Sequence, residues 1–389
     1  SDRYHRVYAR YSWRDCVDAE RTRQADVGIE DGRITAVGDI DGGDTETDGS
    51  GLVVAPGLID SHVHLRLDGG PDPAGTQDMS DYTASYLAAA NLADALAAGV
   101  TTIRDLGSRG PLALDAGKAV SEGTIPGSRV TACGRAIVMT GGHGHWFGRE
   151  ADGPAEVRKA AREQLKHGAD VVKCMATGGV LTEGAVTGAP ELMPAELEAI
   201  VDAAAPTNTP TAAHAHGADG IKNATRAGIS SVEHGTYMDR EAAELMVDHG
   251  TYWVPTVSAL HGIVENGTDA GIPESAVAKA EDAADNFGDA WEHALAAGVN
   301  IAMGTDAGTP FNHFADIPQE MEYMVEYGLS ADQALEAATV NAADLLGLEN
   351  VGRVAEGYRA DLVLLDANPT EDITAWRDPV SVFAAGEQV

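Results

Sequence analysis

The chain of 389 residues carries 61 acidic and 26 basic side chains, so its formal net charge is −35 at neutral pH. Nucleic acids and anionic membranes are polyanions, and a charge of this sign and size argues against both as partners. Apolar residues make up 44% of the sequence, which is enough for the core of a globular protein and argues against an intrinsically disordered chain.

The acidic surplus is distributed along the whole chain, and only six of the 26 basic residues are lysines. An acidic, lysine-poor surface resembles that of proteins from salt-loving microbes, because concentrated cations screen the repulsion between carboxylates. We therefore expect the melting temperature to rise between dilute buffer and molar KCl. A calorimetric melting temperature that stays constant or falls over this range would contradict the halophilic interpretation.

The sequence favours a cytoplasmic protein. Residues 1–14 contain no apolar stretch of the kind found in secretory signals, and no segment reaches the roughly 18 consecutive apolar residues of a membrane helix. Cys16, Cys133 and Cys174 are odd in number and scattered, which predicts free thiols in a reducing compartment. We therefore expect a cytoplasmic location and no contact with membranes.

The N-terminal part of the chain predicts β-structure. Residues 26–38 alternate between apolar and polar side chains on both sides of Asp31 and Gly32, a favoured pair for a hairpin turn. Residues 39–51 are rich in Gly, Asp and Thr and predict a loop.

From about residue 57 a short apolar run is followed by a long Ala-rich helical pattern, and this alternation recurs. The predicted strands are residues 58–65, 99–106, 129–137, 169–176, 210–216, 228–234, 251–257 and 299–305. The predicted helices between them include residues 81–98, 154–167, 194–205, 217–227, 239–249 and 274–297. Eight strands alternating with helices predict an α/β fold with a parallel (β/α)8 TIM barrel, whose chemistry collects at the C-terminal ends of the strands.

The C-terminal part returns to β-structure. A helical pattern over residues 330–346 is followed by two predicted strands, 360–366 and 379–384. Since chain ends often lie close together, the terminal β segments are expected to pair into one small β-sandwich domain. The expected domains are therefore a sandwich of residues 1–56 and 350–389 and a (β/α)8 barrel of residues 57–349.

Polar residues inside the predicted barrel strands are nearly all of metal-ligand type, and each lies near the C-terminal end of its strand. They are His62, His64, Lys173, His214, His216, His234 and Asp306. A single histidine in a strand is more often a hydrogen-bonded core residue than a ligand. Side chains two residues apart on a strand point to the same face, so the histidines of each H-x-H pair lie together. Seven such residues at corresponding places around one barrel predict a metal centre.

Lys173 lies in the apolar run VVKCMA. An unpaired ammonium on a buried strand would cost several kcal/mol or lose its proton. A neutral amine reacts with CO2 to form a carbamate, whose two oxygens are able to bridge two cations about 3.5–4 Å apart, as in two-metal hydrolytic sites. The alternative is that Lys173 forms an ion pair with a neighbouring Asp or Glu.

The segments APGLIDSHVHL, VVKCMATGG, AHAHG, VEHG and GTDAGTP, closed by GRVAEGYRADLVLLD, resemble the amidohydrolase superfamily over essentially the whole chain. The lysine on the fourth predicted strand resembles that of the binuclear, carboxylated-lysine type. The resemblance implies a β-sandwich built from both termini around a metal-bearing (β/α)8 barrel. Because members of this superfamily commonly form homo-oligomers, we expect one here, without a feature that fixes its size.

The resemblance also implies which residues hold the metals. His62, His64 and Asp306 would hold the more buried ion, and His214 and His234 the second, with carboxylated Lys173 and a hydroxide bridging both. His216 would be a ligand or a partner of the ligands. Nitrogen and oxygen donors suit Zn2+ and leave Mn2+ and Co2+ open. Asp306 would accept a proton from the attacking hydroxide and deliver it to the leaving amine; its alternative role is a helix N-cap.

Two further segments resemble the imidazolonepropionase-related branch that contains Xaa-Pro dipeptidases, metallocarboxypeptidases and ochratoxin-type amidases. They are MTGGHGHWFG at residues 139–148 and HGTYMD, which contains Tyr237. The resemblance implies that His143 and Tyr237 are catalytic and substrate-binding groups that polarise the scissile carbonyl or orient the substrate. His145 and His313 are further candidates for substrate binding. The alternative for the loop histidines is a position facing solvent.

Together these features predict a binuclear metallohydrolase that cleaves an amide bond next to a carboxylate by a metal-bridged hydroxide. The expected substrate is a dipeptide or N-acyl amino acid, as for an Xaa-Pro dipeptidase or a carboxypeptidase. Three alternatives stay open among enzymes, namely a cyclic amidohydrolase of the hydantoinase or dihydroorotase type, a lactonase and an organophosphate hydrolase. A metal-free scaffold protein is the non-enzyme alternative.

Overall fold

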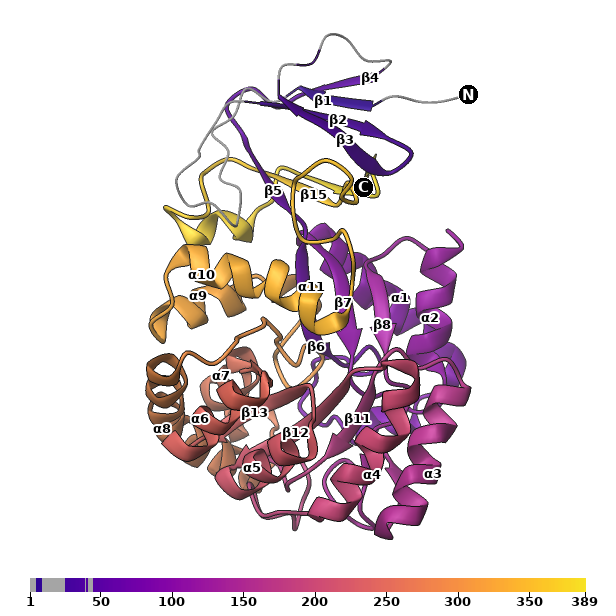
Figure 1. Ribbon diagram of the computed structural model, residues 1–389, viewed down its shortest axis with the longest axis vertical. Coiled ribbons are helices and arrows are strands. Elements are labelled where there is room, and N and C mark those ends of the chain that lie inside the picture. The colour runs from indigo at the N-terminus through magenta and orange to yellow at the C-terminus, as the bar shows by residue number, and fades with distance from the viewer. Residues whose placement is uncertain (1–4, 9–24, 39, 41–44) are drawn as a thin grey trace.

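The computed structural model describes residues 5–8, 25–38, 40 and 45–389. Cys16 and part of the predicted loop at residues 39–51 lie outside them. Within the described residues, a small β-sandwich is joined to a larger barrel of strands surrounded by helices (Figure 1). The predicted α/β class and barrel architecture are confirmed.

The sandwich consists of two four-stranded sheets at one end of the molecule (Figure 1). The first has the order β3-β2-β1-β4, with β1 His5–Tyr8, β2 Asp26–Glu30, β3 Arg33–Gly38 and β4 Thr45–Asp48. The second has the order β17-β16-β15-β5, with β5 Val53–Pro56, β15 Leu362–Leu365, β16 Ser381–Ala384 and β17 Glu387–Gln388. Buried side chains of β2 and β3, such as Val27 and Ile34, cluster with Leu362 and Phe383 of the other sheet. The N- and C-terminal segments therefore share one small core, while the exact domain boundaries stay a prediction.

The predicted hairpin at residues 26–38 is confirmed. Asp31 and Gly32 both take left-handed conformations, with φ of 49° and 74°, which the tight turn between two twisted strands requires. The prediction that residues 39–51 form only a loop is wrong, because β4 pairs in parallel with β1. Backbone pairing to a distant strand outweighs the low strand preference of Glu46 and Asp48 there.

The barrel strands lie in two sheets in which every pairing is parallel. The three-stranded sheet contains β6 Leu58–Val63, β7 Val100–Asp105 and β8 Arg129–Ala132. The six-stranded sheet has the order β10-β9-β11-β12-β13-β14, with β9 Ile137–Val138, β10 Arg149–Glu150, β11 Val172–Met175, β12 Thr211–Gly217, β13 Ser231–Tyr237 and β14 Tyr252–Val254.

Backbone hydrogen bonds connect the two sheets at both of their facing edges. At one edge the Asp170 N–H donates to Ala132 O over 2.9 Å. At the other edge the segment 299–307 lies between β14 and β6, bridging Trp253 through Ile301. The predicted eighth strand thus lies at its expected place in the barrel, but it pairs with its neighbours through isolated β-bridges and forms no continuous strand. The predicted third strand is interrupted between β8 and β9, where Gly134 takes a φ of 70°.

The helices surround these strands (Figure 1). They are α1 Asp81–Ala97, α2 Leu112–Ser121, α3 Gly153–Lys166, α4 Pro194–Ala204, α5 Ala218–Ala227, α6 Arg240–His249, α7 Val257–Asn266, α8 Glu274–Ala297, α9 Gln319–Glu326, α10 Ala331–Ala337 and α11 Val340–Leu346. Six of them match the predicted ranges to within a residue at each end. The helix predicted over residues 330–346 is two helices, because Thr339 (φ −132°, ψ −87°) breaks the regular backbone between α10 and α11. Among the described helices, none combines the length and apolarity needed to cross a membrane.

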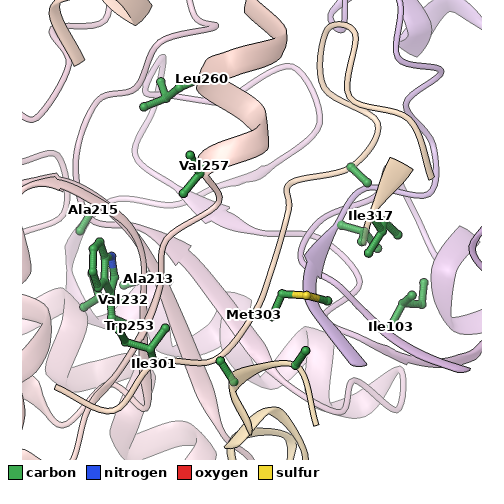
Figure 2. Packing of buried hydrophobic residues seen from close by; sticks show 14 of the residues in the cluster. Ile103, Ala213, Ala215, Val232, Trp253, Val257, Leu260, Ile301, Met303 and Ile317 are labelled. Atoms are coloured by element: carbon green, nitrogen blue, oxygen red, sulfur yellow. The ribbon is translucent and has the colours of Figure 1, made fainter. Parts of the chain in front are cut away.

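The core between strands and helices supports the C-terminal ends of the strands. Trp253 of β14 is fully buried and packs on Trp291 of α8, with ring centroids 4.6 Å apart. Figure 2 shows Trp253 near Ala213 and Val232 of the neighbouring strands. The Trp253 indole N–H donates to the backbone oxygen of His234 over 2.8 Å. Packing in the core thus fixes the backbone of a predicted metal ligand.

Candidate metal centre

The ends of the barrel strands bring the predicted ligands together in two groups. One consists of His62, His64 and Asp306 and the other of His214, His216 and His234, and within each group the potential ligand atoms lie within 4.8 Å of one another. Asp306 Oδ1 lies 3.3 Å from His62 Nε2 and 3.1 Å from His64 Nε2. Two atoms that share a tetrahedral zinc ion at about 2.0–2.2 Å lie roughly 3.4 Å apart. The first group therefore fits a divalent metal ion.

Hydrogen bonds at Nδ1 orient four of the five ligand-type histidines. His62 Nδ1 contacts Glu233 Oε2 at 2.9 Å, His64 Nδ1 contacts Gly107 O at 2.8 Å, His216 Nδ1 contacts Thr236 Oγ1 at 2.7 Å, and His234 Nδ1 contacts Thr256 Oγ1 at 2.7 Å. When Nδ1 is held in this way, Nε2 is the nitrogen left for a metal. His214 Nε2 is buried and has no hydrogen-bond partner among the described residues. An orphaned buried nitrogen is costly unless a ligand occupies it, so the second group also fits a metal ion.

Lys173 on β11 is 1% exposed and lines the same cavity as both histidine groups. None of the ion pairs formed within the described part of the chain involves it, so the structure offers no support for the alternative of a salt-bridged lysine. Burial lowers the pKa of the Lys173 ammonium. The neutral amine is the form that reacts with CO2.

Two of the ligand-type residues have strained backbones. His234 and Asp306 take φ values of 68° and 63°, in the left-handed region that costs a non-glycine residue on the order of 1–2 kcal/mol. Surrounding contacts maintain these conformations, including a 2.7 Å hydrogen bond from the Asp306 N–H to His62 O. Strain of this kind at neighbouring ligand positions is typical of a functional site.

Sequence reasoning missed Glu233, which immediately precedes His234 and is fully buried. Its carboxylate contacts His62 and accepts hydrogen bonds from Ser231 Oγ at 2.5 Å and Arg104 Nη2 at 3.2 Å. Burial opposes its ionisation, but Arg104 and His62 outweigh burial and lower the pKa of Glu233 to about 2. An acidic residue inside an apolar strand was the signal available in the sequence.

Arg104 and Asp105 are neighbours at the end of β7, but they do not pair with each other. Asp105 instead accepts hydrogen bonds from the Leu65 N–H at 2.8 Å and Ser108 Oγ at 2.9 Å, and Arg104 pairs with Glu233. Consecutive side chains of a strand point to opposite faces, so Arg104 and Asp105 contact different parts of the protein.

His143 is buried and lines the cavity beside the second histidine group. Its ring centroid lies 4.4 Å from that of His214, and its Nδ1 has no hydrogen-bond partner among the described residues. Its backbone N–H donates to Glu191 Oε2 over 2.9 Å, which fixes the loop after β9. The structure therefore brings His143 to the centre.

The structure does not bring the other three substrate-binding candidates to the cavity wall. Tyr237 lies at the end of β13, and its hydroxyl donates to Asp282 Oδ2 over 2.6 Å. His145 and His313 are exposed. The substrate roles of these three residues stay predictions.

Gly304 packs directly against the backbone of a candidate ligand. A Cβ atom at this position would lie 2.4 Å from Val254 Cγ1 and 3.0 Å from the backbone nitrogen of His62. We expect Gly304→Ala to destabilise the protein by about 1–3 kcal/mol through overpacking and to lower the metal content by displacing His62. Gly288→Ala on the exposed face of α8 is the matched control, because nothing lies within 4 Å of its Cβ. Equal denaturant midpoints and metal contents for the two variants would contradict the prediction.

Sequence and fold both resemble those of known proteins. The model of a family described as "Amidohydrolase family" matches residues 53–389. Ochratoxinase from Aspergillus niger is 35% identical over 364 residues, covering 85% of this chain and 73% of the relative. The crystal structure of an Xaa-Pro dipeptidase with bound methionine has a TM-score of 0.92 at 32% identity, covering 99% of both chains. A prolidase complexed with N-methylphosphonate-L-proline has the same TM-score at 29% identity, also over 99% of both chains.

Proposed function

This chain belongs to the amidohydrolase family, and from that premise we propose that it is a binuclear metallohydrolase acting on peptide or amide bonds. The proposed substrates are dipeptides, including Xaa-Pro dipeptides, or N-acyl amino acids. The relatives support this class, since they include an Xaa-Pro dipeptidase, a prolidase and ochratoxinase.

The observation that carries the proposal is the convergence of two histidine-rich groups and one buried lysine on a single cavity. His62, His64 and Asp306 would hold one ion, and the group of His214, His216 and His234 the other. A carbamate on Lys173 would supply an oxygen to each. Nitrogen and oxygen donors of this kind favour Zn2+.

Two bound divalent ions would supply Lewis acidity, which lowers the pKa of a water molecule and polarises the scissile carbonyl. The residues of the chain supply the remaining chemistry. Burial opposes ionisation of Asp306, but His62 and His64 hold the pKa of its carboxyl well below the usual range. The group is therefore a carboxylate at neutral pH and is available to accept a proton. Asp306 would take up the proton from water and pass it to the leaving amine, and His143 would donate to the carbonyl oxygen as negative charge develops there.

The experiment that tests this function is a substrate screen with metal analysis. The full chain would be purified without chelator, supplied with zinc and bicarbonate in molar KCl, and incubated with Xaa-Pro dipeptides, other dipeptides and N-acyl amino acids. A hydantoin, dihydroorotate and a lactone would be included as competing substrates. We expect release of the free C-terminal amino acid, about two metal ions per chain, and loss of activity with a chelator that zinc reverses.

Two outcomes would contradict the proposal. Hydrolysis confined to the cyclic amides or the lactone would favour the cyclic amidohydrolase or lactonase alternatives. Less than about half an equivalent of metal, together with no hydrolysis of any compound, would favour a metal-free scaffold.

A further inference from the structure

The ring of His234 is held by a residue at the start of a helix. His234 Nδ1 contacts Thr256 Oγ1 at 2.7 Å, and Thr256 directly precedes α7. By contrast, His216 Nδ1 contacts Thr236, which belongs to the neighbouring barrel strand β13. The orientation of His234 therefore depends on how the first turn of α7 is fixed.

Thr256 occupies the N-cap position of α7 but does not cap the helix. Its φ of 55° and ψ of 51° are left-handed, and its side chain accepts no hydrogen bond from the first turn. A threonine at this position ordinarily satisfies one of the free N–H groups at the start of a helix. Because the Thr256 hydroxyl contacts His234 instead, the first turn of α7 needs an acceptor from elsewhere in the chain.

Glu320 in the first turn of α9 supplies this acceptor. Its Oε1 accepts a hydrogen bond from the Val257 N–H over 2.7 Å. Its Oε2 accepts two from Ser258, over 2.8 Å from the N–H and over 2.6 Å from Oγ. Figure 2 shows Val257 at the start of α7, with Leu260 further along the helix. Glu320 thus fixes the two residues that directly follow Thr256, at the helix end that favours an acidic group.

The position of Glu320 is a costly one for an acid. The side chain is fully buried, and none of the ion pairs within the described part of the chain involves it. Burial raises the pKa of Glu320 to about 7, although hydrogen bonds from Ser258 and Val257 lower it. A capping side chain at position 256 would satisfy the helix without burying a carboxyl group. The arrangement has a physical reason if His234 needs the hydroxyl at position 256.

We propose that Glu320 is a positioning residue of the metal centre, which caps α7 in place of Thr256 and thereby keeps the Thr256 hydroxyl on His234. With Nδ1 held in this way, Nε2 of His234 is the nitrogen left for the ion of the second group. Glu320 does not line the cavity, so it acts through Thr256 and takes no part in bond cleavage. The inference rests on the proposed function for the metal ion, whereas the state of the His234 ring is measurable without metal.

The test is a zinc titration of the metal-free full chain against a competing chelator. Glu320→Gln keeps the size of the side chain but replaces one acceptor by a donor, so the Ser258 N–H loses its partner. We expect one of the two ions to bind about 10–100-fold more weakly and the other to bind as before. The visible absorption of the Co2+-loaded protein should change, because it reports the ligand geometry, and excess zinc should restore kcat.

Variants of Thr256 test the route of this effect. Thr256→Val removes the hydroxyl and should weaken the same ion, whereas Thr256→Ser keeps the hydroxyl and should retain both ions. If Glu320 acts through Thr256, the double variant Glu320→Gln with Thr256→Val should weaken this ion no more than Thr256→Val alone. Additive effects of the two changes would overturn the proposal. Thr256→Ala carries the test if the melting temperature shows that Thr256→Val does not fold.

Two controls separate positioning from stability. Glu326→Gln makes the same chemical change at an exposed position of α9 and should retain both zinc affinities. Ser330→Ala removes the side chain that accepts a hydrogen bond from the Gln333 N–H and caps α10. It should lower the melting temperature and leave zinc binding unchanged. A Glu320→Gln protein that also loses only thermal stability, with both zinc affinities retained, would overturn the proposal.

The outcomes also distinguish this inference from the proposed function. If the unmodified protein binds no metal, the measurement is the pair of 15N NMR shifts of the His234 ring, which report its tautomer and are assigned by their loss in His234→Gln. Shifts that change in Glu320→Gln and Thr256→Val but not in Glu326→Gln would support the positioning role, while the missing metal overturns the proposed function. Unchanged His234 shifts in Glu320→Gln would overturn the inference. Two bound ions and amide hydrolysis, with zinc affinities unaffected by Glu320→Gln, would overturn the inference and leave the hydrolase intact.

Discussion

Lys173→Ala is expected to reduce kcat/KM by about 10³-fold or more, which corresponds to about 4 kcal/mol of transition-state stabilisation. The reason is that the carbamate on Lys173 would hold both metal ions, and alanine offers no ligand atom. Metal content, measured by mass spectrometry after gel filtration, should fall below two ions per chain. Short carboxylic acids such as acetate or propionate should restore part of the activity, because they supply two oxygens in the space left by the lysine.

Lys118→Ala is the matched control for this prediction. Lys118 on α2 is 71% exposed and forms an ion pair with Glu122 one helical turn later, at 3.8 Å. Surface pairs of this kind contribute about 0–1 kcal/mol, so activity and metal content should be retained. A Lys173→Ala protein with full activity and two bound metal ions would refute the bridging role.

Glu233→Ala is expected to destabilise the protein by about 3–5 kcal/mol, because it leaves the buried guanidinium of Arg104 without its carboxylate. It should also weaken metal binding about 10–100-fold, since His62 loses the acceptor at Nδ1 that orients its ring. Urea unfolding and zinc titration measure the two effects separately. The stabilising contribution of Glu233 should be complete above pH 4.5, its ordinary pKa, and be lost as the pH falls towards its value of about 2 in the folded protein.

Glu241→Ala provides the comparison, since it also removes one carboxylate from an ion-pair network. Glu241 is 66% exposed on α6 and pairs with Lys222 and Arg226. Because solvent screens this network, its loss should cost no more than about 1 kcal/mol. Equal losses of stability in the two variants would show that the buried ion pair between Glu233 and Arg104 contributes no more to stability than the exposed network.

Prediction from sequence succeeded where the signal is local. The helices α1, α3 and α8 end within one residue of their predicted limits, because each has a long helical pattern that ends at a stop signal, such as Gly298 after α8. The hairpin at residues 26–38 depends on two adjacent turn residues. By contrast, β4 and the break at Thr339 depend on contacts with distant segments, which a local pattern does not contain.

The candidate site divides in the same way. His62, His64 and Asp306 lie where the strand pattern predicts, because the C-terminal ends of parallel strands meet at one face of a barrel. The positions of His145 and His313 depend on the paths of loops, and neither residue lines the cavity.

By itself, the sequence determined the alternation of strands and helices and the candidate metal ligands. These features follow from side-chain periodicity and spacing, which are properties of short segments. The family was indicated by the resemblance of its motifs to those of known members. Only the tertiary structure decided that Glu233 pairs with Arg104 and that Glu320 caps α7. Such pairings join residues that are remote in sequence, and their geometry depends on how strands are staggered and loops are folded, which no single segment encodes.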